Sequence, residues 1–163
     1  MHDNVQTSVR YNQATAEWLE GLTIAHHPPK RRIKAKHEYY EMRLRKAIEK
    51  EPGWYRYYWF LGYRLYCDGR LDEAVENLEF CRRSNSSQFP VEVLNSTMVL
   101  ATVYQQSQKL VEAKSAIASG LEFLEGVRDD FEVAINFRIR DWLVQANKQL
   151  DEGRSLKSYS FAY

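Results

Sequence analysis

The stretch YWFLGYRLYCDGRLDEAVENL, residues 58–78, decides the fold class. On both sides of Gly69 its apolar residues recur every three or four positions, the spacing that places side chains on one face of an α-helix. Gly69 interrupts the pattern, and a glycine just past the last periodic residue is typical of a helix end. The stretch therefore predicts two helices joined by a tight turn.

The same helical spacing continues along most of the chain. Prolines and glycines are scarce and separate segments of helical length, and no segment shows the strict alternation of a half-buried strand. The predicted helices cover residues 34–50, 54–67, 71–81, 93–106, 110–124 and 131–150. The sequence therefore predicts an all-α protein, with an irregular lead-in before residue 34.

A second copy of the helix-pair pattern follows the first. Residues 71–74 align with residues 110–113, a shift of 113 − 74 = 39, which also brings residues 61–62 onto 100–101. The second copy has Gln108 where the turn glycine of the first copy stands. Residues 44–52 look like the second half of an earlier repeat, and residues 131–135 look like the start of a third.

Residues 58–78 resemble the signature of the tetratricopeptide repeat family. The positions that carry the resemblance are Tyr58, Leu61, Gly62, Leu65, Gly69, Leu71, Glu73, Ala74 and Leu78. A small residue at Gly62 lets paired helices approach, Gly69 ends the first helix, and Ala74 sits at the tightest crossing. The resemblance covers about residues 34–150 and implies a tetratricopeptide-like solenoid of antiparallel helix pairs, about three of them stacked.

The predicted organisation has three parts: residues 1–33 as an irregular lead-in, residues 34–151 as the repeat domain, and residues 152–163 as a C-terminal tail. The tail carries Tyr159, Phe161 and Tyr163. Folding back onto exposed apolar surface and docking to a partner are both open for it.

A second resemblance concerns the passage from Ile24 to Pro52, which is similar to the end of a family 2 glycosyltransferase. In some of those enzymes the catalytic domain finishes on a strand and a histidine, and a helical-repeat tail follows. The resemblance implies that His26 or His27 is a relic of a metal or diphosphate contact. The sugar-nucleotide fold and its Asp-x-Asp motif are absent from this sequence.

The helix predicted over residues 54–67 carries more aromatic residues than one buried face needs. A stripe spaced three, four and three positions lies opposite Leu61 and Leu65, and the family resemblance places it on the concave side of the repeat stack. The stripe consists of Arg56, Trp59, Tyr63 and Tyr66; the repeat shifts add Asn95, Met98, Thr102 and Gln105, and then Asn136 and Arg140. Aromatic, amide and arginine groups together suit recognition of an extended peptide or a sugar. The alternative is that Trp59 and Tyr63 pack against the preceding helix.

The residue pattern predicts neither a metal site nor a cofactor. His26 and His27 are adjacent and lack the spacing that puts two ligands on one helical face. Cys67 and Cys81 are predicted to be reduced and to pack near each other inside one helix pair. No nucleophile–base pair or phosphate-binding loop is visible, so independent catalysis is not expected.

The net charge and the hydropathy pattern argue against some classes of partner. The net charge is +1, which gives no basic field for nucleic acid, so the run of residues 30–36 is predicted to be a solvated linker. Charged residues interrupt every apolar stretch before it is long enough to cross a bilayer, and the first eight residues lack the apolar core of a signal peptide. The sequence therefore favours a cytoplasmic protein without membrane partners.

These patterns support three functional hypotheses. The first is a module that binds a peptide or partner protein in the concave groove of the repeats. The second is a stand-alone or split tail of a glycosyltransferase, which would pair with the catalytic subunit and hold an acceptor protein. The third is homo-oligomerisation through the aromatic surface.

Overall fold

The computed structural model describes residues 30–127 and 137–156 of the 163-residue chain. In these two ranges the structure contains only helices and no strand, so the prediction of an all-α fold is confirmed for them. The helices are α2 (Lys30–Lys50), α3 (Tyr55–Cys67), α4 (Leu71–Arg83), α5 (Pro90–Gln106), α6 (Leu110–Gly126) and α7 (Phe137–Asp151). The chain divides into two compact units, Met1–Lys34 and Ala35–Tyr163, and the second contains α3 to α7 together with α2 from Ala35 onward.

Two helices begin earlier in the chain than the sequence predicted. Helix α2 starts at Lys30, so the basic run of residues 30–36 is helical, and its prediction as a linker was wrong. Helix α5 starts at Pro90, where the fixed backbone angle of proline suits the first helical position and its missing N–H has no helical partner to lose. Residues 131–136, predicted to open the last helix, lie outside the described residues.

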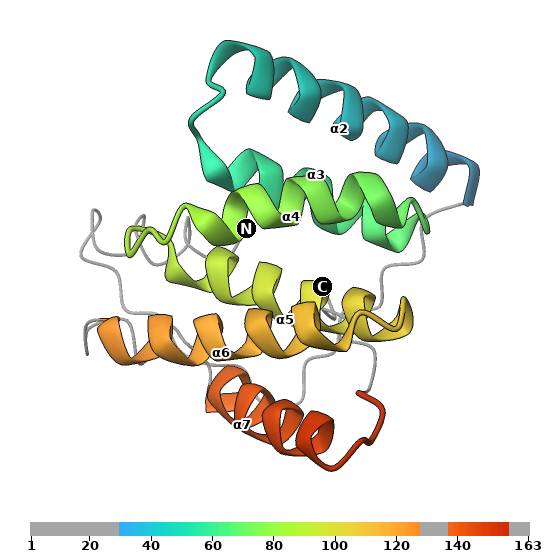
Figure 1. Cartoon of the computed structure of the whole chain (residues 1–163). Helices are drawn as coiled ribbons and strands as arrows, with labels where there is room; N and C mark the ends of the chain where they lie inside the picture. The colour runs from blue at the N-terminus through green and yellow to red at the C-terminus, as the bar shows by residue number, and fades with distance from the viewer. Residues whose placement is uncertain (1–29, 128–136, 157–163) are drawn as a thin grey trace, which may run out of the picture. The chain divides into compact units, whose positions relative to one another are not determined.

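Consecutive helices pack against each other from α3 to α7, so the predicted packing of adjacent helix pairs is observed (Figure 1). Helix α5 also contacts α3 and α7, and these three helices are called the inner layer. Helix α5 thus contacts α3, α4, α6 and α7, and all of its residues from Val93 to Val103 are buried. A helix buried all round contributes most of the core.

The contact between α3 and α4 depends on a residue without a side chain. A Cβ atom added at Gly62 would lie 2.7 Å from Cγ of Leu78 and 3.1 Å from the Leu78 backbone nitrogen. Ala74, one turn earlier on α4, is fully buried. The prediction that a small residue at Gly62 lets the two helices approach closely is confirmed.

The same turn ends each helix of the inner layer. Its central residue has a left-handed backbone, with φ of 76° at Gly69, 59° at Gln108 and 69° at Gly153. The next residue donates its N–H to the carbonyl five positions earlier: Arg70 to Leu65 at 3.0 Å, Lys109 to Tyr104 at 2.8 Å and Arg154 to Gln149 at 2.8 Å. The first two turns are separated by 108 − 69 = 39 residues, the repeat shift found in the sequence. The second and third turns are separated by 153 − 108 = 45 residues.

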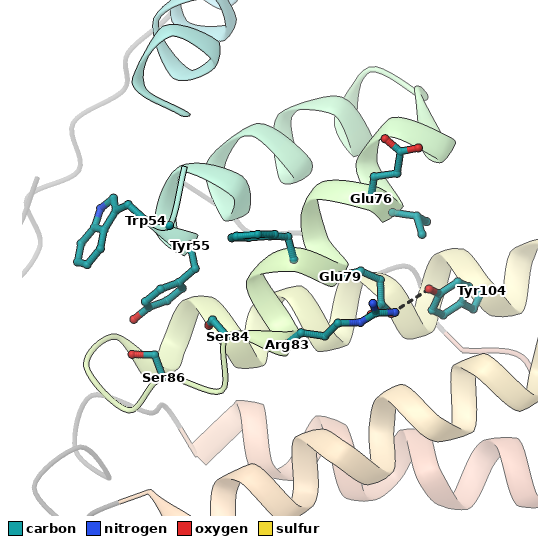
Figure 2. Close-up of a pocket in the computed structure, with 11 residues that line it drawn as sticks. Trp54, Tyr55, Glu76, Glu79, Arg83, Ser84, Ser86 and Tyr104 are labelled. Carbon is teal, nitrogen blue, oxygen red and sulfur yellow. Dashed lines mark hydrogen bonds and ion pairs between the residues drawn. The ribbon is translucent and has the colours of Figure 1, made fainter. Parts of the chain in front are cut away.

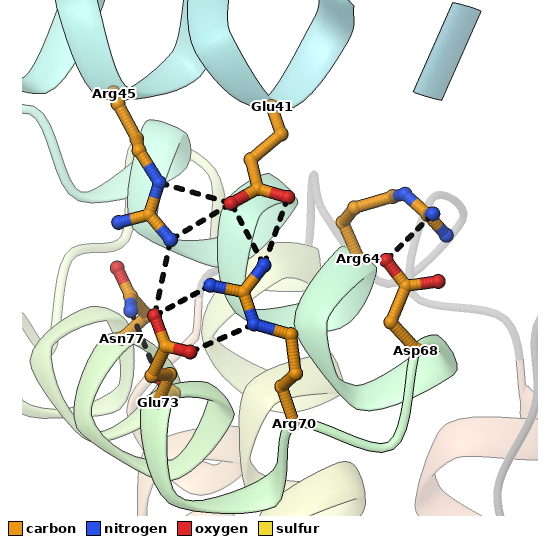
Figure 3. A network of polar contacts seen from close by, with 7 residues as sticks. All are labelled: Glu41, Arg45, Arg64, Asp68, Arg70, Glu73 and Asn77. Atoms are coloured by element: carbon orange, nitrogen blue, oxygen red, sulfur yellow. Dashed lines mark hydrogen bonds and ion pairs between the residues drawn. The ribbon is translucent and has the colours of Figure 1, made fainter. Parts of the chain in front are cut away.

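Helix α2 is joined to α4 by four alternating charges (Figure 3). Arg45 donates to Glu41 at 2.8 Å and to Glu73 at 3.1 Å. Arg70, at the start of α4, donates to the same two carboxylates, at 2.9 Å and 2.7 Å. Leu44 is buried on the same helix, with 6% of its surface exposed. These charges and this leucine attach α2 to the rest of its unit.

Candidate functional site

The aromatic stripe predicted on α3 is a continuous ladder of rings. The rings of Trp59 and Tyr63 are stacked with their centroids 5.1 Å apart, and Tyr66 follows at 6.1 Å from Tyr63. Tyr63 and Tyr66 are half-buried, whereas only 2% of Trp59 is exposed. Trp59 therefore belongs to the hydrophobic core, whereas the alternative that Trp59 and Tyr63 pack against the preceding helix stays a prediction.

Arg56, predicted as a partner contact, is engaged inside the protein. Its Nη2 and Nε lie 2.6 Å and 2.7 Å from Oε1 of Glu92. Its guanidinium also lies over the ring of Phe89, 3.9 Å from the centroid. Because Glu92 belongs to α5, the pair ties two helices of the inner layer together. A binding role for Arg56 stays a prediction.

Four predicted residues share one face of α5 and are called the α5 row: Asn95, Met98, Thr102 and Gln105. The sequence placed this row on an open groove, but the first three side chains are buried. Thr102 donates its hydroxyl to the Met98 carbonyl at 3.0 Å, which satisfies it locally. Asn95 Oδ1 is buried and accepts no hydrogen bond within the described residues. Partner binding by these three residues stays a prediction.

Gln105, at the end of the row, bonds to a non-helical segment of the main chain. Its Nε2 donates to the Arg154 carbonyl at 3.1 Å, and its Oε1 accepts the Leu156 N–H at 2.7 Å. The two bonds bracket Ser155, which makes no helix with its neighbours. One side-chain amide thus bonds to a carbonyl and to an N–H two residues apart. Any extended peptide offers this pair of backbone groups, whatever its side chains are.

The third helix of the inner layer contributes Arg140, which is exposed. The turn spacing gives its position in the repeat: 56 + 39 = 95, and 95 + 45 = 140. Arg140 therefore corresponds to Arg56 on α3 and to Asn95 on α5. Asn136, the other residue predicted on this helix, lies outside the described residues.

A cleft of about 1040 Å³ lies beside α4 (Figure 2). The sequence did not predict it. One side comes from a face of α4 and the other from the start of α3, with Ser84, Ser86 and Tyr104 completing the wall. The lining from α3 and α4 and the residue before α3 consists of Trp54, Tyr55, Val75, Glu76, Glu79, Phe80 and Arg83.

The charge of Glu79 in this cleft is already compensated. Glu79 accepts hydrogen bonds from Tyr104 at 2.9 Å, Arg82 at 2.7 Å and Arg83 at 3.0 Å. Burial raises the pKa of Glu79, but the hydrogen bonds from Arg82 and Tyr104 outweigh burial and bring the pKa below its usual value. Burial and the neighbouring carboxylate raise the pKa of Tyr104 to about 12. Glu79 is therefore an ionised structural hub at neutral pH and not a general base.

No family model, curated protein or solved structure matches this chain. The two family resemblances therefore rest on sequence motifs alone. Within residues 30–127 and 137–156 there is no group of three or more His, Cys, Asp or Glu side chains that could hold a metal ion. His26 and His27 lie outside these ranges. No helix in the described part of the chain is long and apolar enough to cross a membrane.

The two cysteines differ in their surroundings. Cys67 is exposed at the last position of α3, so the prediction that both thiols pack inside one helix pair was wrong for it. Cys81 is fully buried, and its thiol lies 3.7 Å from the Glu92 carbonyl. Burial raises the pKa of Cys81 to about 12, which leaves the buried thiol protonated and unreactive.

Proposed function

We propose that this chain is a tetratricopeptide-like interaction module that binds an extended segment of a partner protein along its inner layer. It has no catalytic role of its own in this proposal. The observation that carries the proposal is the pair of hydrogen bonds from Gln105 to the main chain at Arg154 and Leu156. Gln105 already bonds to the main chain of a non-helical segment, and that segment belongs to the same chain.

The turn geometry supports the repeat assignment. Left-handed residues at corresponding positions end α3, α5 and α7, with the same hydrogen bond after each. Corresponding positions on three helices of one layer give a row of equivalent side chains, which is how stacked repeats present an extended binding surface. Gln105 and Tyr66 are equivalent positions by the 39-residue shift, since 66 + 39 = 105.

Contacts to the main chain of the partner segment and contacts to its side chains contribute differently to recognition. The amide of Gln105 supplies affinity for any extended segment, because it bonds only to backbone atoms. The half-buried rings of Tyr63 and Tyr66 supply selectivity, since aromatic rings favour apolar and aromatic side chains of the bound segment. The expected partner is therefore an extended segment with apolar or aromatic residues on one side.

Selection from random displayed peptides tests the proposal. The immobilised target is a chain that ends at Gly153, because residues 154–156 fill the hydrogen-bonding positions of Gln105. Circular dichroism first establishes that this shortened chain is folded. We expect enriched peptides that compete with one another and that lose binding to the same chain carrying Gln105→Ala. The proposal is contradicted if no peptide is enriched, or if the enriched peptides bind the Gln105→Ala chain as well as they bind the parent chain.

A matched control comes from α7. Gln145 is an exposed glutamine in the middle of that helix. Gln145→Ala removes the same chemical group without touching Gln105, so the selected peptides should bind this variant as they bind the parent chain.

A further inference from the structure

Helix α2 carries a row of exposed positive side chains along one face. Lys36, Arg43, Lys46 and Lys50 are spaced seven, three and four residues apart, and this spacing places them on one side of a helix. All four side chains are exposed. In the part of the chain that the structure describes, none of the four forms an ion pair with a carboxylate. We call these four residues the α2 cationic row.

The carboxylates of the same helix stand on other sides of it. Glu41 is bound by Arg45 and Arg70 in the network that attaches α2 to α4. At 3.6 residues per turn, Glu38 and Glu49 stand roughly a quarter of a turn or more from the middle of the row. No carboxylate of α2 therefore interrupts the row, and its positive charge is available to a partner.

A cleft of about 370 Å³ lies beside the row, between α2 and the start of α3. Arg43 belongs to both the row and the wall of the cleft. Arg56, which also lines it, is paired with Glu92, so the rest of the wall offers mainly apolar and ring surface. The aromatic lining consists of Tyr40, Trp54, Tyr57 and Phe60. An aromatic cleft with an unpaired arginine at its wall suits an aromatic side chain that has acidic neighbours.

We propose that the α2 cationic row and this cleft bind an acidic segment of a partner protein that carries an aromatic side chain. The aromatic side chain enters the cleft, and the acidic side chains on either side of it pair with the row. Complementary charge brings the segment to the row, and the cleft fixes its register. The inference goes beyond the proposed function, because it concerns a different surface and uses neither Gln105 nor the rings of Tyr63 and Tyr66.

The distribution of charge favours an acidic protein segment over a nucleic acid. Helix α2 has nine lysines and arginines and three glutamates, a net charge of 9 − 3 = +6, whereas the whole chain has +1. The rest of the chain therefore carries 1 − 6 = −5. The row is about 21 Å long, so a short acidic segment needs nothing beyond it. A nucleic-acid strand is negative along its whole length, and the negative remainder of the chain repels the part that extends past α2.

Selection from a biased peptide library tests the inference on the full-length chain. The displayed peptides have about eight residues, with glutamate at every second position and random residues between them. We expect enriched peptides to share an aromatic residue and to bind Arg43→Glu, Lys46→Glu at least about tenfold more weakly than wild type. No enrichment, or equal binding to wild type and to this double variant, overturns the inference. Circular dichroism first establishes that the double variant is folded.

A salt titration of the wild-type chain gives a second readout that needs no substitution. Raising the salt from about 0.1 M to about 1 M shortens the screening length from about 10 Å to about 3 Å. The enriched peptides should lose affinity over this range, because their glutamates pair with exposed cations. An affinity that does not change with salt contradicts recognition by the row.

A matched control changes the same amount of charge elsewhere. Lys109, just before α6, and Lys148, on α7, are exposed lysines outside the row. Lys109→Glu, Lys148→Glu should bind the enriched peptides as wild type does. Equal weakening by the two double variants would show that only the net charge of the chain matters, and the inference would be wrong.

Two neighbouring tyrosines separate the role of the cleft from that of the row. Tyr40 lines the cleft and is 44% exposed, whereas Tyr39 is 57% exposed and does not line it. Replacing the aromatic residue of an enriched peptide by alanine should weaken its binding to wild type about fivefold. This difference should disappear in Tyr40→Ala and persist in Tyr39→Ala. The same difference in both variants contradicts binding of the aromatic residue in the cleft.

Two further measurements distinguish this inference from its alternatives. A labelled oligouridylate of about eight nucleotides should bind the full chain more weakly than an enriched peptide does. Tighter binding of the oligouridylate, lost in Arg43→Glu, Lys46→Glu, would assign the row to nucleic acid instead. Gln105→Ala should leave binding of the acidic peptides unchanged. If it abolishes their binding, they bind at the inner layer, and this inference fails while the proposed function does not.

Discussion

Arg56 and Glu92 form an ion pair at 2.6 Å that joins α3 to α5 inside the inner layer. The carboxylate side chain is 11% exposed and the guanidinium 30% exposed. Phe89 covers the guanidinium from one side at 3.9 Å. The spacing of the two inner helices thus depends on one largely buried charge and its partner.

Removing one member of this pair should destabilise the fold. Glu92→Gln leaves Arg56 with a buried neutral partner, and the expected loss in the free energy of unfolding is about 1–3 kcal/mol. Urea denaturation followed by circular dichroism measures it. The double variant Arg56→Met, Glu92→Met removes both charges and should be more stable than Glu92→Gln alone. A double variant that is no more stable than Glu92→Gln would contradict this account of the pair.

The close contact at Gly62 predicts an unusual response to alanine. Alanine usually stabilises a helix relative to glycine by about 1 kcal/mol. At Gly62 the new Cβ would lie 2.7 Å from Leu78 Cγ, so Gly62→Ala should instead lower the free energy of unfolding by about 1–3 kcal/mol. Gly126→Ala is the control, because this glycine is also helical and a Cβ there meets nothing within 4 Å. Equal effects of the two substitutions would contradict the packing of α3 on α4.

The charges that attach α2 predict a loss of stability in acid. Burial raises the pKa of Glu41, but hydrogen bonds from Arg45 and Arg70 outweigh it and bring the pKa below its ordinary 4.5. Hydrogen bonds from Arg70 also lower the pKa of Glu73. Between the folded and unfolded pKa values the unfolded chain binds more protons, so the stabilisation is present above the unfolded value and is lost as pH falls through the folded values.

Thermal unfolding measured across this pH range should therefore show a midpoint that falls as pH drops below 4.5, the ordinary pKa of these carboxyls. Glu41→Gln should flatten this part of the profile, since one of the two carboxylates no longer titrates. Glu49→Gln, at an exposed position on the same helix, should leave the profile unchanged. A profile that is equally steep in wild type and Glu41→Gln would exclude the network as its cause.

The two thiols should react at very different rates. Cys67 is exposed, whereas Cys81 is buried with a pKa of about 12. The buried Cys81 thiol stays protonated near neutral pH, and its burial keeps a reagent away from the sulfur. A thiol-reactive dye should label one cysteine quickly in the native protein and the second only after denaturation. Two rapid phases in the native protein would contradict the burial of Cys81.

The helices and their turns could be predicted from the sequence because the signals are local. Apolar spacing marks each helix, and Gly69 and Gly62 mark a turn and a close contact that depend on a few neighbouring residues. Even the repeat with Gln108 in place of the turn glycine could be found, because its flanking apolar residues keep their spacing. Helix starts at Lys30 and Pro90 were missed, since a basic run and a proline look like linkers in isolation.

The burial and the contacts of the predicted site residues could not be predicted from the sequence in the same way. Asn95, Met98 and Thr102 lie opposite the apolar face of α5 and look like surface residues when one helix is considered alone. They are nevertheless buried in the folded chain, where α5 contacts α3, α4, α6 and α7, and such tertiary packing leaves no local pattern in the sequence. The bonds from Gln105 to Arg154 and Leu156 connect residues 49 and 51 positions apart, so no local pattern encodes them.

The most direct test of the central claim is a titration of one selected peptide, labelled with a fluorophore, into the chain ending at Gly153, with and without Gln105→Ala. Loss of two hydrogen bonds of about 1 kcal/mol each should weaken binding by about 30-fold. Gln145→Ala should change nothing. Equal affinities for the parent chain and Gln105→Ala would contradict the claim that this layer binds extended segments through Gln105.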